Sequence, residues 1–214
     1  MPPTFRHAMA AVSLTVALTL ATSTATITFA SASARPAAPA TMSWDSWAAT
    51  TSGLPPHSIW IDEVATVTDR ASAYLATRLP DSTIEPAVVL DIDNTTLETT
   101  YAGGITIPAI LPSLALAEQA HDSGAAVIFV TARPAILRQI TVHNLEEAGY
   151  AVDDLHMRGI LDFSDKQTLK TNARIQIEEA GYTIVANIGN NDSDVAGGHA
   201  ERTFKLPDYH GQLS

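Results

Sequence analysis

The 214-residue sequence contains no cysteine, and only 6% of its residues are aromatic. The absence of thiols excludes disulfide cross-links and a lipid-bearing cysteine, so the chain is not a lipoprotein. With 46% hydrophobic and 16% charged residues, the composition fits one soluble globular domain better than a disordered chain. A domain of about 180 residues can bury enough apolar surface to fold without cross-links.

Acidic residues are missing from the N-terminal segment until Asp45. Residues 1–34 combine a cation at Arg6 with an apolar stretch and small residues at Ala32-Ser33-Ala34, which predicts a cleaved secretory signal peptide. The alternative is a retained membrane anchor, which the many Thr and Ser residues disfavour. We expect residues 35–43 to be a linker and residues 44–214 to form the folded domain of a secreted or cell-envelope protein.

The charge balance is strongly acidic, with a formal net charge of −11. Removal of residues 1–34 takes away one of the 12 Lys and Arg residues and none of the 23 Asp and Glu residues, so the charge becomes −12. Such a domain repels nucleic acids and anionic membranes at long range, and we expect neither as a stable partner. Any anionic ligand must therefore be held by local cations.

Helical and strand patterns alternate along the domain. Apolar residues at helical spacing predict a helix over residues 58–78, which Pro80 ends. Further helices are expected at residues 112–124, at 134–149 and from Ser164, where Ser164 and Gln167 fit a capping box. Short apolar runs predict buried strands at residues 87–90, 125–131 and 183–189. Alternating units of this kind predict an α/β fold with a parallel sheet between two layers of helices.

Two of the expected helices carry further detail. In the helix expected at residues 134–149, apolar residues should lie along one side: Ile136, Leu137, Ile140, Leu145 and Ala148. This helix and the next end in nearly identical segments, "LEEAGYAV" and "IEEAGYTIV". Gly149 and Gly181 can adopt the left-handed conformation that follows a helix, and the tyrosine after each can fold back on the last turn.

Polar clusters follow the three expected strands. Asp91 and Asp93 follow the first, Thr131 the second, and the segment from Asn190 to Asp194 the third. The carboxyl ends of parallel strands meet at one edge of a sheet, so these residues should lie together. A magnesium site formed by Asp91, the Asp93 carbonyl and an oxygen of the third cluster would relieve the repulsion between the aspartates. The alternative is a solvated acidic turn.

Other common sites find no support in the sequence. The seven histidines lack the spacing of a zinc site, and Gly103-Gly104 belongs to no phosphate-binding glycine loop.

The order of the motifs resembles the haloacid dehalogenase (HAD) superfamily of phosphatases. Those motifs are "VVLDIDNT", "VIFVT", a lysine on a helix, and the acidic loop "GNNDSD". Together with "FVTARP", "KTNARIQIEEAGYTIVANIG" and "AERTFKLPDY", they are similar to subfamily III, the class B and C acid phosphatases and the plant vegetative-storage-protein-like enzymes. The resemblance covers Trp44 to the C-terminus and implies a HAD-like, Rossmann-like core with a small or minimal cap, for which residues 97–111 are the candidate.

The resemblance implies a role for each matching residue. Asp91 falls on the nucleophile that forms an aspartyl-phosphate, and Asp93 on the general acid and base. Thr95 would orient this loop, and Thr131 would bind a phosphoryl oxygen. The motif lysine is placed at Lys170, with Lys166 as the alternative, although a solvated basic stripe of Lys166, Lys170 and Arg174 is the default interpretation of their spacing.

One position departs from the family pattern. Asn190 stands where the family usually has an aspartate that binds the metal. We expect Mg²⁺ to be held by Asp91, Asp93, Asn190 and Asp194, with Asp192 as an alternative ligand. Thr95, Arg133 and Asn190 are the expected substrate-binding residues, and Arg158 and Arg202 are weaker candidates.

The implied function is a secreted, Mg²⁺-dependent acid phosphatase of broad substrate range that hydrolyses phosphate monoesters. The alternatives are a 5′-nucleotidase or phosphotransferase of the same fold, and a catalytically weakened storage or phosphate-binding protein. The sequence leaves open whether the protein is a homo-oligomer.

Overall fold

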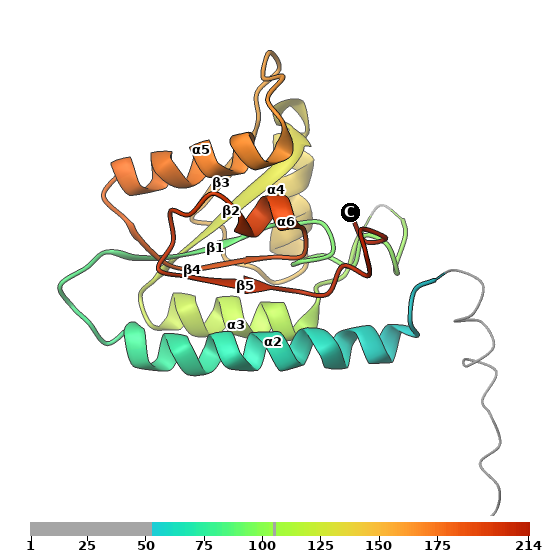
Figure 1. Cartoon of the computed structure of the whole chain (residues 1–214), viewed down its shortest axis with the longest axis horizontal. Helices are drawn as coiled ribbons and strands as arrows, with labels where there is room; N and C mark the ends of the chain where they lie inside the picture. The colour runs from blue at the N-terminus through green and yellow to red at the C-terminus, as the bar shows by residue number, and fades with distance from the viewer. Residues whose placement is uncertain (1–52, 105) are drawn as a thin grey trace, which may run out of the picture. The chain divides into compact units, whose positions relative to one another are not determined.

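A computed structural model describes residues 53–104 and 106–214, which form a five-stranded parallel sheet with helices on both faces (Figure 1). The expected signal peptide and linker lie outside the described residues. The strand order is β3-β2-β1-β4-β5. The bounds are β1 (Pro86–Leu90), β2 (Ala126–Pro134), β3 (Asp154–Arg158), β4 (Thr183–Gly189) and β5 (Arg202–Lys205).

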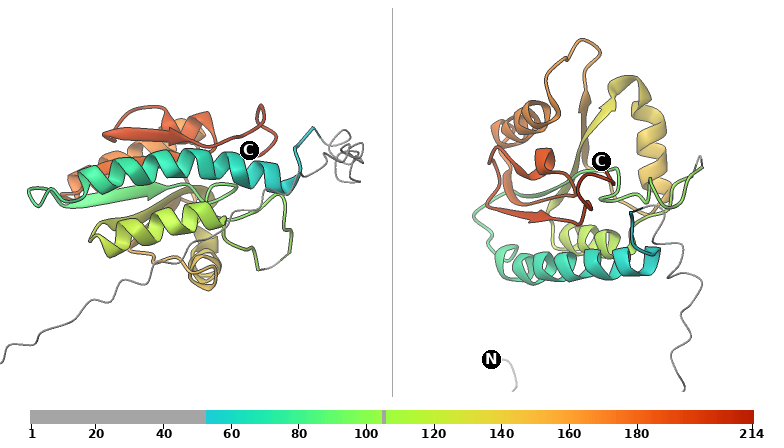
Figure 2. Two further views of the ribbon diagram at one scale, coloured as in Figure 1. Left: turned by 90° about the horizontal axis from the view of Figure 1, so that it is seen from below. Right: turned by 45° about the vertical axis from the view of Figure 1, so that its right-hand side comes forward.

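The central strand β1 is buried on both faces because helices cover both sides of the sheet. Val88 and Leu90 pack into the larger core, which contains residues of α2 (His57–Arg78), α3 (Leu111–Asp122) and α4 (Arg138–Glu147). Ala87 and Val89 pack into the smaller core with residues of α5 (Lys166–Glu179). Figure 2 shows α2 and α3 side by side on one face. The predicted three-layer α/β fold is therefore confirmed.

The two edge strands were not predicted from the sequence. β3 has the sequence DLHMR and buries only Leu155, and β5 has the sequence RTFK and buries only Phe204. An edge strand contacts a neighbour on one side only and needs less apolar surface than a central strand. Their patterns therefore lack the continuous apolar runs that identified β1, β2 and β4.

Two helix predictions were wrong in detail. The N-cap of α5 is Asp165, whose carboxylate accepts from the Thr168 N–H at 3.0 Å, whereas the Ser164 hydroxyl donates to Asp162. The helix expected from residue 134 begins as a 3₁₀ turn, η1 (Ala135–Leu137), and continues as α4. Its apolar stripe is mostly exposed, since Leu145 is buried but Ile136 is 79% exposed, and Leu137 and Ile140 also face solvent.

The repeated helix ends were predicted correctly. Gly149 and Gly181 have φ angles of 100° and 102°, in the region that favours glycine. The N–H of Tyr150 then donates to the Leu145 carbonyl, and that of Tyr182 to the Ile177 carbonyl. These bonds satisfy carbonyls in the last turns of α4 and α5.

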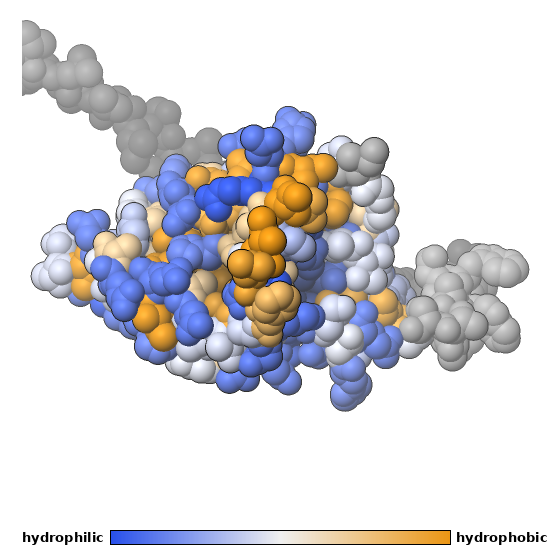
Figure 3. Space-filling view, turned by 90° about the horizontal axis from the view of Figure 1, so that it is seen from above, coloured by the Kyte–Doolittle hydropathy of each residue, from blue (hydrophilic) through white to orange (hydrophobic). Residues whose placement is uncertain are grey.

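The candidate cap is a loop that packs on the core. Between β1 and α3, Leu97 forms an isolated bridge with Ala109, and both residues are buried. Exposed apolar side chains instead follow the next two strands: Ile136 comes after β2, and Ile160, Leu161 and Phe163 come after β3. Hydrophobic residues gather on the face shown in Figure 3. Over the residues that the structure describes, no helix combines the length and hydropathy needed to span a membrane.

Candidate functional site

The loop after β1 turns tightly around the carbonyl of Ile92. The N–H groups of Thr96 and Leu97 donate to this oxygen at 2.9 and 3.0 Å. Asn94 occupies the left-handed region with φ 56°, which asparagine tolerates better than most residues. The turn places Asp91 inside the protein, with a 5% exposed fraction, and leaves Asp93 partly open to solvent.

The loop after β4 is short, and it leads directly into the helix α6 (Asp192–Val195). Asn191 and Asp194 form a capping box, in which the Asn191 N–H donates to the Asp194 carboxylate at 2.8 Å. A Cβ atom at Gly189 would collide with the Asp194 side chain. Glycine at this position therefore lets the Asp194 carboxylate turn back toward the end of the sheet.

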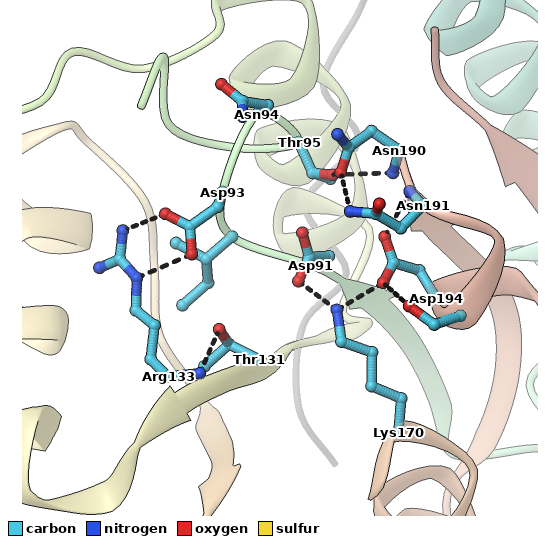
Figure 4. A network of polar contacts seen from close by, with 12 residues as sticks. Asp91, Asp93, Asn94, Thr95, Thr131, Arg133, Lys170, Asn190, Asn191 and Asp194 are labelled. Carbon is cyan, nitrogen blue, oxygen red and sulfur yellow. Dashed lines mark hydrogen bonds and ion pairs between the residues drawn. The ribbon is translucent and has the colours of Figure 1, made fainter. Parts of the chain in front are cut away.

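Lys170 joins the two loops. Its Nζ lies 2.5 Å from Oδ1 of Asp91 and 2.5 Å from Oδ1 of Asp194, and all three side chains are at least 94% buried (Figure 4). Removal of either carboxylate would leave Lys170 with one partner, and removal of Lys170 would leave two buried carboxylates without a cation. The three side chains come from the loop after β1, from α5 and from α6, so their meeting depends on the pairing of β1 with β4 and on the packing of α5.

One ammonium group does not fully compensate two buried carboxylates. Burial raises the pKa of Asp91 to about 6; the Lys170 charge opposes this shift and the Asp194 charge adds to it. Burial also lowers the pKa of Lys170, but the charges of Asp91 and Asp194 more than offset this effect and the pKa is raised. Lys170 therefore stays charged, whereas Asp91 takes up a proton in mildly acidic solution.

Arg133 holds Asp93 as a carboxylate. Its Nε and Nη2 atoms donate to the two carboxylate oxygens at 3.0 and 2.6 Å, and the Thr99 hydroxyl donates to Oδ1 at 2.8 Å. Burial alone raises the pKa of Asp93, but these donors outweigh it and the pKa is lowered. The pKa values of the two aspartates are therefore shifted in opposite directions, because burial dominates at Asp91, which shares Lys170 with Asp194, whereas the Arg133 and Thr99 donors dominate at Asp93.

A pocket of about 290 Å³ opens between the two loops. Asp91, Asp93, Thr131 and Lys170 line it, so four residues predicted from the sequence face one cavity. The Thr131 hydroxyl accepts the Arg133 N–H at 3.1 Å, which leaves the hydroxyl proton free to donate into the pocket. The pocket is small enough to suit a phosphoryl group and part of a leaving group.

Asn190 is fully buried, and its backbone N–H and both polar atoms of its side chain form hydrogen bonds. Its N–H donates to the Thr95 hydroxyl at 3.0 Å, and its side-chain oxygen accepts from Thr95 and from the Asn191 amide, both at 3.2 Å. Its side-chain nitrogen donates to the Leu213 carbonyl at 2.8 Å. The neighbouring Asn191, and not Asn190, is among the residues that line the pocket.

Arg174 was expected only as part of a solvated stripe, and it is instead fully buried. Its guanidinium donates to the backbone carbonyls of Asp194 at 2.7 Å and Gly198 at 2.8 Å, and also to that of Ala196. It thereby holds the segment that carries Asp194. The spacing of four residues from Lys170 was the available signal, since it places both cations on one side of α5.

Other predicted residues lie apart from this cluster. The Asp192 side chain is 95% exposed and pairs with Lys205, whereas Lys166 lines the same pocket as Lys170 but is not one of the ion-paired residues. Arg158 donates to the carbonyls of Asp162 and Ser164. Arg202 stacks on the Tyr74 ring beside a different hollow, between α2 and β5.

The donor set suits a small divalent cation. Lys170 bonds Oδ1 of Asp91, so Oδ2 remains for a metal, and the other nearby donors are the Asp194 carboxylate, the Asn191 amide and the Asp93 carbonyl. Three carboxylates, those of Asp91, Asp93 and Asp194, form ion pairs with two cations, Lys170 and Arg133, and Lys166 also lines the pocket. Within residues 53–104 and 106–214, no group of three His, Cys, Asp or Glu residues is arranged to hold a metal by itself.

The sequence matches a known family over residues 103–212, described as HAD superfamily, subfamily IIIB (acid phosphatase). Among curated proteins, the stem 28 kDa glycoprotein of Glycine max is 34% identical over 119 residues, covering 53% of this chain and 47% of that protein. Acid phosphatase 1 of Solanum lycopersicum is 36% identical over 107 residues, covering 48% of this chain and 41% of that protein. The chain thus spans less than half the length of these relatives in the matched region.

The fold is similar to that of the class C acid phosphatase from Bacillus anthracis. The TM-score is 0.58 at 17% identity, over 73% of this chain and 83% of that chain. This likeness supports the fold.

The raised pKa of Asp91 predicts how stability depends on pH in chelator. Between pH about 4 and 6 the folded chain holds a proton on Asp91 that the unfolded chain releases, so this group's contribution to stability is lost as the pH rises through about 6. D91N lacks this pH-dependent contribution to stability, because an amide does not titrate in this range. The melting temperature of D91N should therefore rise relative to wild type from pH about 4 to 7, as followed by circular dichroism. A constant difference over this range would contradict the assignment.

Proposed function

Because the chain belongs to the HAD superfamily, subfamily IIIB (acid phosphatase), we propose that it hydrolyses phosphate monoesters through an aspartyl-phosphate on Asp91. The observation that carries this proposal is the shared Lys170, which lies 2.5 Å from both Asp91 and Asp194 at the floor of the pocket. Lys170 keeps a positive charge beside the carboxylate that must attack a phosphoryl group of like charge.

The reaction is two displacements at phosphorus. Asp91 attacks the phosphorus, the bond to the ester oxygen breaks, and Asp93 gives a proton to the departing alkoxide. Asp93 then takes a proton from a water molecule that attacks the phosphorus, which releases inorganic phosphate and restores Asp91. Lys170 and the Thr131 hydroxyl stabilise charge on the phosphoryl oxygens.

Mg²⁺ is the cofactor that these residues favour. Asp91, the Asp93 carbonyl and Asp194 would hold it, with Asn190 or Asn191 completing the set, and it would supply positive charge that keeps Asp91 ionised. The raised pKa of Asp91 in the metal-free chain supports this assignment, because burial penalises the charge that a cation would stabilise.

Arg133 has two tasks in this proposal. In the free protein it pairs with Asp93, and that pairing keeps Asp93 ionised. A general acid must carry a proton, so Arg133 has to loosen its hold before Asp93 can act. A phosphoryl group bound beside Thr131 would attract the Arg133 guanidinium, and the backbone N–H of Arg133, which donates to the Thr131 hydroxyl, keeps the two residues next to each other.

Export is part of the proposal. The apolar segment with Arg6 at residues 1–34 supports cleavage by a signal peptidase and a working site outside the cell or in its envelope. The lack of cysteine means that folding there requires no disulfide formation.

An assay with an aryl phosphate tests the activity. With Mg²⁺ present, D91N should release phosphate at a rate lower than wild type by roughly 10³-fold or more, because the nucleophile is lost. Chelator should reduce the wild-type rate to a similar extent, and Mg²⁺ should restore it. D192N, which makes the same change at an exposed aspartate at the start of α6, serves as the control and should retain activity. Equal rates for wild type and D91N would instead support a phosphate-binding protein without catalysis.

Substitution of Arg133 by glutamine tests its two tasks together. Loss of a charged contact to the phosphoryl group should raise KM roughly 10- to 100-fold. The pKa of Asp93 should also rise, since its strongest stabilising donor is gone, and the alkaline limb of the kcat profile should move to higher pH. R138Q is the control, because Arg138 lies on α4 and donates to the Leu155 carbonyl. An unchanged profile with raised KM would leave Arg133 as a substrate contact only.

The intact mass of the protein recovered from the culture medium tests export. We expect a chain that begins at or near Arg35, after cleavage at Ala32-Ser33-Ala34. Recovery of the full-length chain with the membrane fraction would support the anchor instead.

A further inference from the structure

The segment that follows β5 returns across the carboxyl end of the sheet. The Leu206 N–H donates to the Gly189 carbonyl at 2.9 Å, and the Tyr209 hydroxyl donates to Glu63 of α2 at 2.7 Å. Leu206 and Leu213 are each 1% exposed and belong to the larger core. Leu213 is therefore fixed in position by its own burial, next to the two loops of the site.

The backbone carbonyl of Leu213 accepts two side-chain amides. Asn94 Nδ2 donates to it at 2.9 Å and Asn190 Nδ2 at 2.8 Å. Asn94 comes from the loop that carries Asp91 and Asp93, and Asn190 from the loop that carries Asp194. One oxygen thus connects the two loops that build the pocket, and both donors belong to buried residues, of which Asn94 also donates to the Thr100 hydroxyl.

The same contact accounts for the amide at position 190. A carboxylate there would place an oxygen, with no proton to donate, 2.8 Å from the Leu213 carbonyl oxygen. It would also add a buried negative charge next to Asp91 and Asp194, which already share the single ammonium group of Lys170. Asparagine gives its nitrogen to Leu213 and its oxygen to Thr95 and Asn191, which satisfies both ends of the side chain.

We propose that Leu213 is a positioning residue of the site: its carbonyl oxygen holds Asn94 and Asn190 together, sets the spacing of the two loops, and requires an amide at position 190. The effect on turnover rests on the proposed function, whereas the effect on the loops does not. In this arrangement Asn190 fixes the positions of the two loops without lining the pocket. Asn191 lines the pocket, so its amide is the one available to a ligand there.

The first experiment measures the contact without any catalysis. In chelator, N190D should lower the melting temperature by roughly 4–8 °C, because a buried donor is lost and an unpaired charge is added. In an L213A background, where the carbonyl is no longer anchored, the same substitution should lower it by at most about half as much. Additive effects of the two substitutions would overturn the proposal. If L213A does not fold, L213V takes its place.

The second experiment separates positioning from general stability. L116A makes the same truncation in the same core, on α3 and away from the pocket. L213A and L116A should both lower the melting temperature, but only L213A should lower kcat for an aryl phosphate, by roughly 10-fold, with KM changed less. Equal kcat values for the two variants would overturn the proposal.

Calorimetric titration with Mg²⁺ distinguishes the two roles of residue 190, a side chain held by Leu213 or a ligand of the metal. N190D should bind Mg²⁺ no more tightly than wild type if residue 190 is held by Leu213. Tighter binding by N190D, together with an unchanged melting temperature in chelator, would show that Asn190 is a weakened metal ligand and would overturn the proposal. An inactive wild-type protein would refute the proposed phosphatase activity. The non-additive effects of N190D and L213A on the melting temperature would still test the contact between Leu213 and Asn190.

Discussion

The site depends on the sharing of one buried ammonium group by two buried carboxylates. Burial of a charge is costly unless a partner lies at hydrogen-bond distance, and Lys170 meets this condition with both Asp91 and Asp194. The three groups come from the loop after the central strand β1, from the helix α5 on one face, and from the short helix α6 that follows β4. The fold must therefore be complete before any of these charges is compensated.

Two further residues hold Asp194 in this position. Gly189 leaves room for the Asp194 side chain, and Arg174 binds three carbonyls of the segment from Asp194 to Gly198. Because a guanidinium carries donors in a fixed plane, it defines the path of that segment more closely than a lysine could. Lys170 and Arg174 lie one turn apart on α5, so the helix that supplies the shared ammonium also holds its second partner in place.

The sequence predicts the centre of this structure better than its edges. The strands β1, β2 and β4 are buried on both faces and have continuous apolar runs, and their polar ends identify Asp91, Asp93, Thr131 and the loop after β4. The edge strands β3 and β5 each bury one apolar residue and give no such signal. Ile136 and Ile140 have helical spacing but face solvent, because periodicity shows that residues share a side without showing what covers it.

Sequence patterns could not predict the contacts between residues that lie far apart in the chain. The Arg133–Asp93 ion pair joins residues 40 positions apart, and the Leu213 carbonyl meets Asn94 across 119 positions. Neither follows from spacing within one element. The departure at Asn190 was visible in the sequence, but its cause was not, since the partner that requires an amide is a backbone oxygen far along the chain.

The charge balance sets a condition for the binding of an anion at this edge of the sheet. A phosphate monoester meets long-range repulsion from a chain of net charge −11, and near the pocket it meets three carboxylates. Lys170 and Arg133 are already engaged by those carboxylates, so neither cation is wholly available to the phosphoryl group. A divalent cation would reverse this balance: it would compensate Asp91 and Asp194 and so release part of the Lys170 charge toward the ligand. The metal and the phosphoryl group would then bind with positive coupling, because each carries the charge that the other requires.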